Sequence, residues 1–302
     1  MKTLNRKILY IATIFLAILY VFSFTKSCSS KDRRKLIKTA LVNPKYKDSI
    51  SEFELYRGNS KLTIKKTDNF WTIKSSQEIL QKNNDIYQLP ASDEKMKNFI
   101  NTLTGIVNMY KISDDINKGS AFGLSGFESF HIKYHIKDGE AHELIFGKHD
   151  FSQTSRFFMT DKNTAVYETN LNFDSFLTTS IQSWAEPFII SQEVFGKIKP
   201  EDIVQQTPKI TDLQKFLELR HGGFPSHYQS SDNPDTAIIM ELGNKKRIVL
   251  NIFKTDSQQE YIVKVQYFSA TRDGSLSNDN AFYISHYKIS YWTYNKIKEI
   301  TL

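Results

Sequence analysis

The order of apolar and polar positions divides the chain into one long apolar segment and a body of shorter patterns. Residues 8–24 are 17 uncharged, mostly apolar positions with basic residues on both sides. An apolar helix of this length is about 25 Å long, close to the roughly 30 Å of a bilayer core. The pattern therefore predicts a membrane-spanning anchor within residues 1–25.

Much of the body alternates with the period of a β-strand. In residues 129–137, "SFHIKYHIK", apolar side chains take every second position, with His or Lys between them. Such alternation is typical of an antiparallel sheet with one buried and one wet face. Asp138 and Gly139 then predict a hairpin turn into a second strand over residues 141–147.

Two segments of the first half repeat apolar residues at helical spacing. One follows Ser92, a favourable N-cap, and the other closes the half. Their apolar stripes are Met96, Phe99, Ile100 and Leu103 in the first, and Phe173, Phe176, Ile181 and Trp184 in the second. Both patterns predict amphipathic helices that pack on the sheet.

The second half repeats this plan. We expect a strand over residues 196–204, a helix that begins at a capping box of Thr211 and Gln214, and a hairpin at Gly243-Asn244. The last helix is expected to bury one stripe: Ile289, Trp292, Ile297 and Ile300. The two closing segments align without a gap at an offset of 116 residues, which suggests an internal duplication.

These patterns predict an α+β protein. An N-terminal transmembrane helix precedes two tandem antiparallel β-sheet modules, each flanked by amphipathic helices. The expected divisions are a cytoplasmic tail and anchor at 1–25, a basic stalk at 26–48, a first module at 49–188 and a second, divergent module at 189–302.

The net charge of +7 belongs to the segment around the anchor. Residues 1–38 hold nine Lys or Arg and one Asp, whereas the remaining 264 residues hold 31 basic and 32 acidic residues. A neutral body lacks the basic surface with which proteins bind nucleic acids. The basic segment suits anionic lipid headgroups, so the expected partner is a lipid bilayer and not a nucleic acid.

The only cysteine, Cys28, leaves two interpretations of the N-terminus open. It cannot form an internal disulfide, but it follows the apolar run much as the lipid-modified cysteine of a bacterial lipoprotein does. The residues before it fit that signal poorly, and the apolar run is longer than that of a cleaved leader. We expect a single-pass anchor in the cytoplasmic (inner) membrane with the body outside the cytoplasm. A lipoprotein lipidated at Cys28 is the alternative.

The sequence contains no pattern that predicts catalysis, a cofactor or a metal ion. His131 and His135 are separated by about 13 Å along a strand, too far for one ion to bridge. The glycines of residues 119–126 fit neither a dinucleotide fingerprint nor a P-loop nor a nucleophile elbow. We therefore expect a protein that is not an enzyme.

A dense aromatic cluster near the C-terminus is the candidate binding surface. Its members are Tyr283, Tyr287, Tyr291, Trp292 and Tyr294. Packing between a helix and a sheet accounts for many such side chains, and part of the cluster remains a candidate surface for a partner.

A series of segments in the first half resembles a bacterial family known only as domain of unknown function 4340. The carrying segments include "FELYRGNSKLTIKKTDNFWTIK", "LPASDEKMKNFINTL", "AFGLSGFESFHI", "ELIFGK", "RFFMTDKNTAVYETN" and "SFLTTSIQSWAEPFI". Their order and spacing cover about residues 50–190, and the second half resembles the family more loosely. The resemblance implies a membrane-anchored protein, often encoded beside ABC-type exporter components similar to those of the gliding-motility apparatus, with no established catalytic residues.

The expected function is therefore a non-enzymatic accessory or scaffold subunit outside the cytoplasm, in an ABC-type exporter or gliding-like complex. A surface lipoprotein that binds an external ligand is the second interpretation. An enzyme built from scattered residues is the third, and it predicts a deep pocket with convergent polar groups.

Overall fold

The computed structural model describes residues 16, 20, 36–67, 70–75, 89–160, 165–225, 233–243, 245–256, 259–269 and 281–301. Cys28 and most of the expected anchor lie outside these residues. Within them, no helix is long and apolar enough to cross a membrane.

The first sheet contains ten antiparallel strands in the order β1-β6-β10-β9-β8-β7-β2-β3-β4-β5. The strands are β1 (Leu36–Ala40), β2 (Ile50–Arg57), β3 (Ser60–Lys66), β4 (Trp71–Ser75), β5 (Leu89–Pro90), β6 (Ile106–Ser113), β7 (Phe130–Ile136), β8 (Ala141–His149), β9 (Arg156–Thr160) and β10 (Val166–Thr169). Residues 36–48, which we expected in the stalk, instead form β1 and the 3-10 helix η1 (Pro44–Tyr46). β1 pairs with β6, so this part of the expected stalk belongs to the first sheet.

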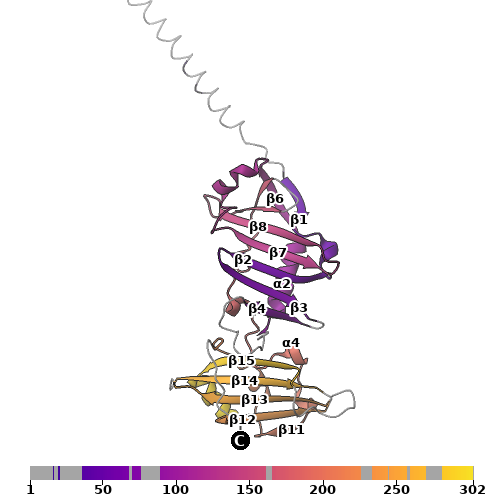
Figure 1. Ribbon diagram of the computed structural model, residues 1–302, viewed down its shortest axis with the longest axis vertical. Coiled ribbons are helices and arrows are strands. Elements are labelled where there is room, and N and C mark those ends of the chain that lie inside the picture. The colour runs from indigo at the N-terminus through magenta and orange to yellow at the C-terminus, as the bar shows by residue number, and fades with distance from the viewer. Residues whose placement is uncertain are drawn as a thin grey trace, which may run out of the picture.

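The second sheet contains five antiparallel strands in sequence order. They are β11 (Ile203–Thr207), β12 (Thr236–Leu242), β13 (Lys246–Lys254), β14 (Glu260–Phe268) and β15 (Tyr283–Ser290). The four strands β12–β15 form a meander, as do β7–β10 in the first sheet. In Figure 1, β2, β7 and β8 of the first sheet and β12–β15 of the second lie across the long axis, with β15 next to the β4 end of the first sheet.

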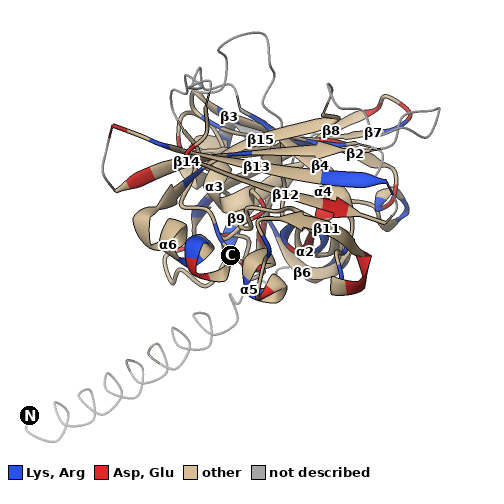
Figure 2. Cartoon of the chain, turned by 90° about the horizontal axis from the view of Figure 1, so that it is seen from below, with Lys and Arg blue, Asp and Glu red and all other residues tan. Residues whose placement is uncertain are grey.

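The helices are few and mostly short. They are α2 (Asp93–Thr104), α3 (Ile181–Trp184), α4 (Gln192–Phe195), α5 (Leu213–Leu217), α6 (Tyr291–Ile300) and the 3-10 helices η3 (Ile116–Phe122) and η4 (Pro200–Asp202). The described chain is therefore mostly β, and only α2 and α6 are amphipathic helices of the predicted kind. In Figure 2, α2, α5 and α6 lie on one side of the strands, and charges of both signs are scattered over the cartoon.

The prediction for α2 is confirmed in detail. The Ser92 side chain accepts a hydrogen bond from the Lys95 N–H (3.4 Å) and caps the helix. The four residues of the predicted stripe are buried: Met96, Phe99, Ile100 and Leu103. The Phe99 ring lies 4.9 Å from the Phe53 ring and 5.0 Å from the Trp184 ring, so α2 fills the core of the first sheet.

The predicted helix that closes the first half is wrong. Phe173 and Phe176 are buried, but they lie in turns, and only the four residues of α3 are helical. Asn172 Oδ1 accepts a hydrogen bond from the Asp174 N–H (3.0 Å), which satisfies that backbone group outside a helix. Asn and Asp favour such local turns over helix interiors because their side chains compete for the backbone.

The predicted stripe of the last helix is wrong at its first two positions, whereas Ile297 is buried and Ile300 packs against the core. Ile289 lies on β15, because Ser290 caps α6 by accepting a hydrogen bond from the Thr293 N–H (3.2 Å). Starting the helix at this point turns Trp292 outward, where 77% of it is exposed. The buried residues of α6 are Tyr294 and Ile297.

The opening elements of the second half differ from the prediction as well. β11 begins at Ile203 after the η4 turn, so residues 196–199 are not a strand. The N-cap of α5 is Asp212, whose Oδ1 accepts a hydrogen bond from the Lys215 N–H (3.1 Å). The predicted capping box is therefore placed one residue too early.

Two segments, residues 184–189 and 219–223, connect the sheets; we call them the joint. The first segment extends the first sheet beyond β5, because the Glu186 N–H donates to the Pro90 carbonyl (2.8 Å). Ala185 forms a bridge with Ala91 beside this bond.

The two segments of the joint also pair with each other and with the second sheet. The Ile189 N–H donates to the Leu219 carbonyl (2.9 Å), and the Gly222 N–H donates to the Lys288 carbonyl of β15 (2.8 Å). Backbone hydrogen bonds therefore run from the first sheet through the joint into the second. The buried hydrophobic residues of both sheets likewise form one cluster.

Candidate functional site

The open face of the first sheet holds a chain of hydrogen bonds with the connectivity of a catalytic triad. His131 lies on β7, with Nδ1 2.9 Å from Glu143 Oε1 and Nε2 2.9 Å from Ser129 Oγ. Tyr56 on β2 donates to the same Glu143 oxygen, and its ring stacks on the imidazole with the centroids 4.4 Å apart. Strand alternation brings Tyr56, His131 and Glu143 together on the face away from the core, and Ser129 directly precedes β7.

This arrangement is structural and not a nucleophilic site. Ser129 is only 1% exposed, and its hydroxyl donates to the Gly126 carbonyl (2.7 Å), which holds the loop before β7. The hydrogen bond from His131 lowers the pKa of Glu143, despite partial burial, so this carboxylate stays ionised between its two donors. A nucleophile must reach its substrate, and this hydroxyl is enclosed.

A second cluster on the same face contains three potential metal ligands. One ligand atom from each of Glu52, Glu54 and His135 lies within 4.8 Å of the others. However, Lys61 Nζ lies 3.0 Å from Glu54 Oε2, and Lys65 Nζ lies 4.0 Å from Glu52 Oε2. Both carboxylates therefore have ammonium partners, and the cluster is an ion-pair network on the sheet surface.

The electrostatics of Glu54 agree with this interpretation. Burial on its own would raise its pKa, but the hydrogen bond and charge of Lys61, with the charges of Lys133 and His135, hold that pKa below its ordinary value. His131 and His135 belong to separate clusters, as the strand spacing predicts. The sequence analysis missed Glu52 and Glu54, whose positions opposite His135 and Lys133 depend on the register between β2 and β7.

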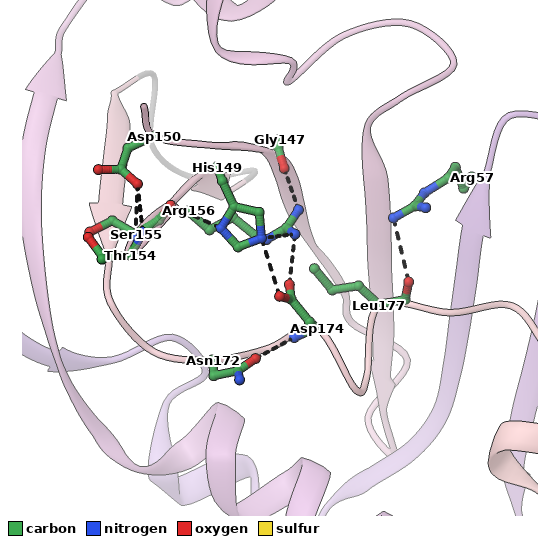
Figure 3. A network of polar contacts seen from close by, with 10 residues as sticks. All are labelled: Arg57, Gly147, His149, Asp150, Thr154, Ser155, Arg156, Asn172, Asp174 and Leu177. Carbon is green, nitrogen blue, oxygen red and sulfur yellow. Dashed lines mark hydrogen bonds and ion pairs between the residues drawn. The ribbon is translucent and has the colours of Figure 1, made fainter. Parts of the chain in front are cut away.

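A third network fixes the segment that follows β10 (Figure 3). Arg156 Nη2 donates to Asp174 Oδ1 (2.7 Å), and His149 Nε2 lies 3.2 Å from Asp174 Oδ2. Arg57 Nη2 donates to the Leu177 carbonyl at the longer distance of 3.5 Å. These contacts hold the turns at residues 173–177 against β2, β8 and β9, in place of the predicted helix.

A pocket of about 220 Å³ lies where residues 41–46 cross the ends of β7–β9. It is lined by Leu41, Asn43, Tyr46, Tyr134, His142, Glu143, Leu144 and Thr160. Ligand sites usually have volumes of about 300–1,000 Å³. The pocket is smaller than that range, and Ser129, His135 and Asp174 do not line it.

The members of the aromatic cluster near the C-terminus do not share one surface. Tyr287 and Tyr294 are buried, at 0% and 6% exposure, so they are core residues and not a partner surface. Tyr283 is half-buried against Phe70 of the first module, with the ring centroids 5.6 Å apart.

Only Tyr291 and Trp292 are exposed, at 45% and 77%. Their rings form an edge-to-face pair with centroids 6.3 Å apart at the start of α6. We call these two residues the aromatic pair.

These features define a mainly β protein with two linked antiparallel sheets, whose described polar clusters stabilise strands and turns. A family described as a domain of unknown function, DUF4340, matches residues 82–223, so the chain carries a DUF4340 domain over these residues. The match contains β5–β11 and both segments of the joint, and it leaves β1–β4 and β12–β15 outside. No curated protein and no solved structure matches the chain. The family that the sequence resembles is thereby confirmed, and its function is unknown.

Proposed function

We propose that the protein is a non-enzymatic accessory or scaffold subunit, anchored in the membrane with its body outside the cytoplasm. Its complex is of the ABC-type exporter or gliding-like kind that the family resemblance implies. The observation that carries the proposal is the aromatic pair. Tryptophan and tyrosine dominate the energetics of protein interfaces, and Trp292 is 77% exposed although Trp71 and Trp184 are buried.

The arrangement of the sheets supports a scaffold. The joint covers the β5 and β15 edges, and among the described strands this leaves β1 and β11 as the outer strands. An outer strand offers unpaired backbone groups to an added strand of a partner. An anchor before residue 36 confines these surfaces near the bilayer and so raises their effective concentration for a membrane partner.

The polar clusters support a role without catalysis. The hydroxyl of Ser129 is enclosed, and the carboxylates of Glu52 and Glu54 have lysine partners. Both clusters stabilise the sheet through contacts within the chain, and these contacts do not require a substrate.

Crosslinking from position 292 in native membranes tests the proposal. A photoreactive amino acid replaces Trp292, and the same probe at Phe151, an exposed residue in the turn between β8 and β9, serves as the matched control. We expect the probe at 292 to capture a transporter permease or ATPase-associated subunit, identified by mass spectrometry, with a lower yield when Tyr291→Ala is added. Failure to recover any membrane subunit from position 292, or equal recovery from position 151, would remove the proposal.

The lipoprotein alternative differs from the membrane anchor in one respect: residues 1–27 are removed from the mature protein. We expect the mature protein to retain these residues and the Cys28→Ser variant to stay in the membrane. Palmitate labelling that disappears in Cys28→Ser, together with loss of residues 1–27, would establish the lipoprotein instead.

A further inference from the structure

Glu186 lies within the first segment of the joint and is only 8% exposed. Its backbone polar groups link the joint to the first sheet and the two segments of the joint to each other: its N–H donates to the Pro90 carbonyl (2.8 Å), and its carbonyl accepts from His221 Nε2 (2.8 Å). The residue therefore lies where both segments of the joint meet the edge of the first sheet.

The side chain of Glu186 faces other acids. Asp93 at the start of α2 and Glu193 on α4 act on it as like charges, and Arg220 opposes them from the second segment of the joint. Among the described residues, no Lys, Arg or His nitrogen forms an ion pair with its carboxylate within 4.0 Å. The N–H of Phe188 donates a hydrogen bond to the carboxylate.

The remaining charged or titratable groups around Glu186 do not compensate its charge. Lys97 pairs with Asp93, and Lys95 Nζ donates to the Ser183 carbonyl (2.8 Å). Burial lowers the pKa of His221, so this imidazole is neutral near pH 7. From the second sheet, burial raises the pKa of both Tyr267 and Tyr287 well above neutrality, so these phenols are also uncharged.

We propose that Glu186 is a proton-operated switch of the joint. The neutral carboxyl allows the two segments to close on β5 and β15. The ionised carboxylate, desolvated beside Asp93 and Glu193, weakens this pairing and lets the second sheet move relative to the first.

The direction of the pH effect follows from the environment of Glu186. Burial raises its pKa from 4.5 to about 7, with smaller contributions from Glu193 and Asp93. The closed joint therefore binds the proton more tightly than an open joint, in which the carboxyl meets water. The resulting stabilisation of the closed joint is fully present below pH 4.5 and is lost as the pH rises to about 7. From these two values, opening becomes about tenfold more favourable between about pH 6 and about pH 8.

Amide hydrogen exchange on the full chain, measured by mass spectrometry at pH 6, 7 and 8, tests the proposal. The measured exchange rate of each peptide is divided by its intrinsic exchange rate at the same pH, so that only the change in protection is compared. We expect protection of peptides that cover residues 184–191 and 219–223 to fall about tenfold over this range. Peptides from β7, in the centre of the first sheet, should keep their protection.

Two variants separate the switch from general pH effects. Glu186→Gln keeps the shape of the side chain without its charge, so its joint peptides should be equally protected at all three pH values. Glu201→Gln is the matched control, because that side chain is 68% exposed, and it should behave like the wild type.

Glu193→Gln removes one of the facing charges and should move the midpoint to lower pH, which keeps the test decisive if Glu186→Gln does not fold. The proposal is overturned by pH-independent protection in the wild type, by an unchanged pH dependence in Glu186→Gln, or by an unchanged midpoint in Glu193→Gln.

Discussion

Tyr267→Phe tests how strongly the second sheet holds the segment that follows the joint. The Tyr267 hydroxyl accepts a hydrogen bond from the Ser191 N–H (2.9 Å), and both residues are 0% exposed. The substitution removes only this oxygen, because the ring keeps its contact with Phe195 at 5.6 Å. The Ser191 N–H is then buried without its partner, which costs about 1–3 kcal/mol.

Equilibrium urea unfolding of the full chain measures this cost. A Trp292→Phe background leaves Trp71 and Trp184 as the two tryptophans, so that tryptophan fluorescence follows the first sheet, and far-UV circular dichroism follows both sheets. We expect one transition, seen by both probes, whose free energy of unfolding falls by about 1–3 kcal/mol in Tyr267→Phe.

The control for this experiment is Tyr291→Phe, which removes a hydroxyl from a side chain that is 45% exposed. Its free energy of unfolding should change by less than about 0.5 kcal/mol. If Tyr267→Phe changes stability no more than this control does, the hydrogen bond between Ser191 and Tyr267 does not contribute and the reasoning fails.

Other substitutions test the first module and the aromatic pair. Phe99→Ala removes a fully buried ring between Phe53 and Trp184. The free energy of unfolding should therefore fall by about 3–5 kcal/mol in the same urea assay. A loss below about 1 kcal/mol would contradict the observed packing of this ring. Ser92→Ala removes the N-cap of α2 and should cost about 0.5–2 kcal/mol, whereas Ser92→Asp, which keeps a capping oxygen, should retain most of the stability. Trp292→Ala should leave stability unchanged within about 0.5 kcal/mol, since the side chain is exposed; a larger loss would show that the ring packs within the chain.

The parts of the fold that depend on local pattern were predictable. The alternation of residues 130–136 and the helical spacing after Ser92 are each set within one segment, and the structure buries the predicted side chains in both. The same reasoning fails after β10, where Phe173 and Phe176 are buried as predicted but lie in turns. Helical spacing indicates which residues face the core, but it does not establish that the segment between them is helical.

The aromatic cluster shows a related limit. Sequence proximity groups five aromatic residues, but Tyr287 lies on a strand and faces the core, whereas Trp292 lies on a helix and faces solvent. The boundary between β15 and α6 at Ser290 decides which of these side chains faces the core and which faces solvent. Moving that boundary by one or two residues along the sequence would reverse the two orientations.

The joint and the polar clusters could not be read from the sequence. Pairing of Pro90 with Glu186 and of Gly222 with Lys288 connects residues that are 96 and 66 positions apart. Likewise, Glu52 meets His135 only because β2 pairs with β7 in one register. No periodicity within a segment contains that information.

The orientation of the strands has a mechanical consequence. Because β2, β7, β8 and β12–β15 lie across the long axis in Figure 1, the hydrogen bonds between these neighbouring strands point along that axis. A pulling force between the two ends would load these bonds a few at a time, so the strands would peel apart in succession instead of resisting together in shear. Such a body withstands tension between its two ends poorly.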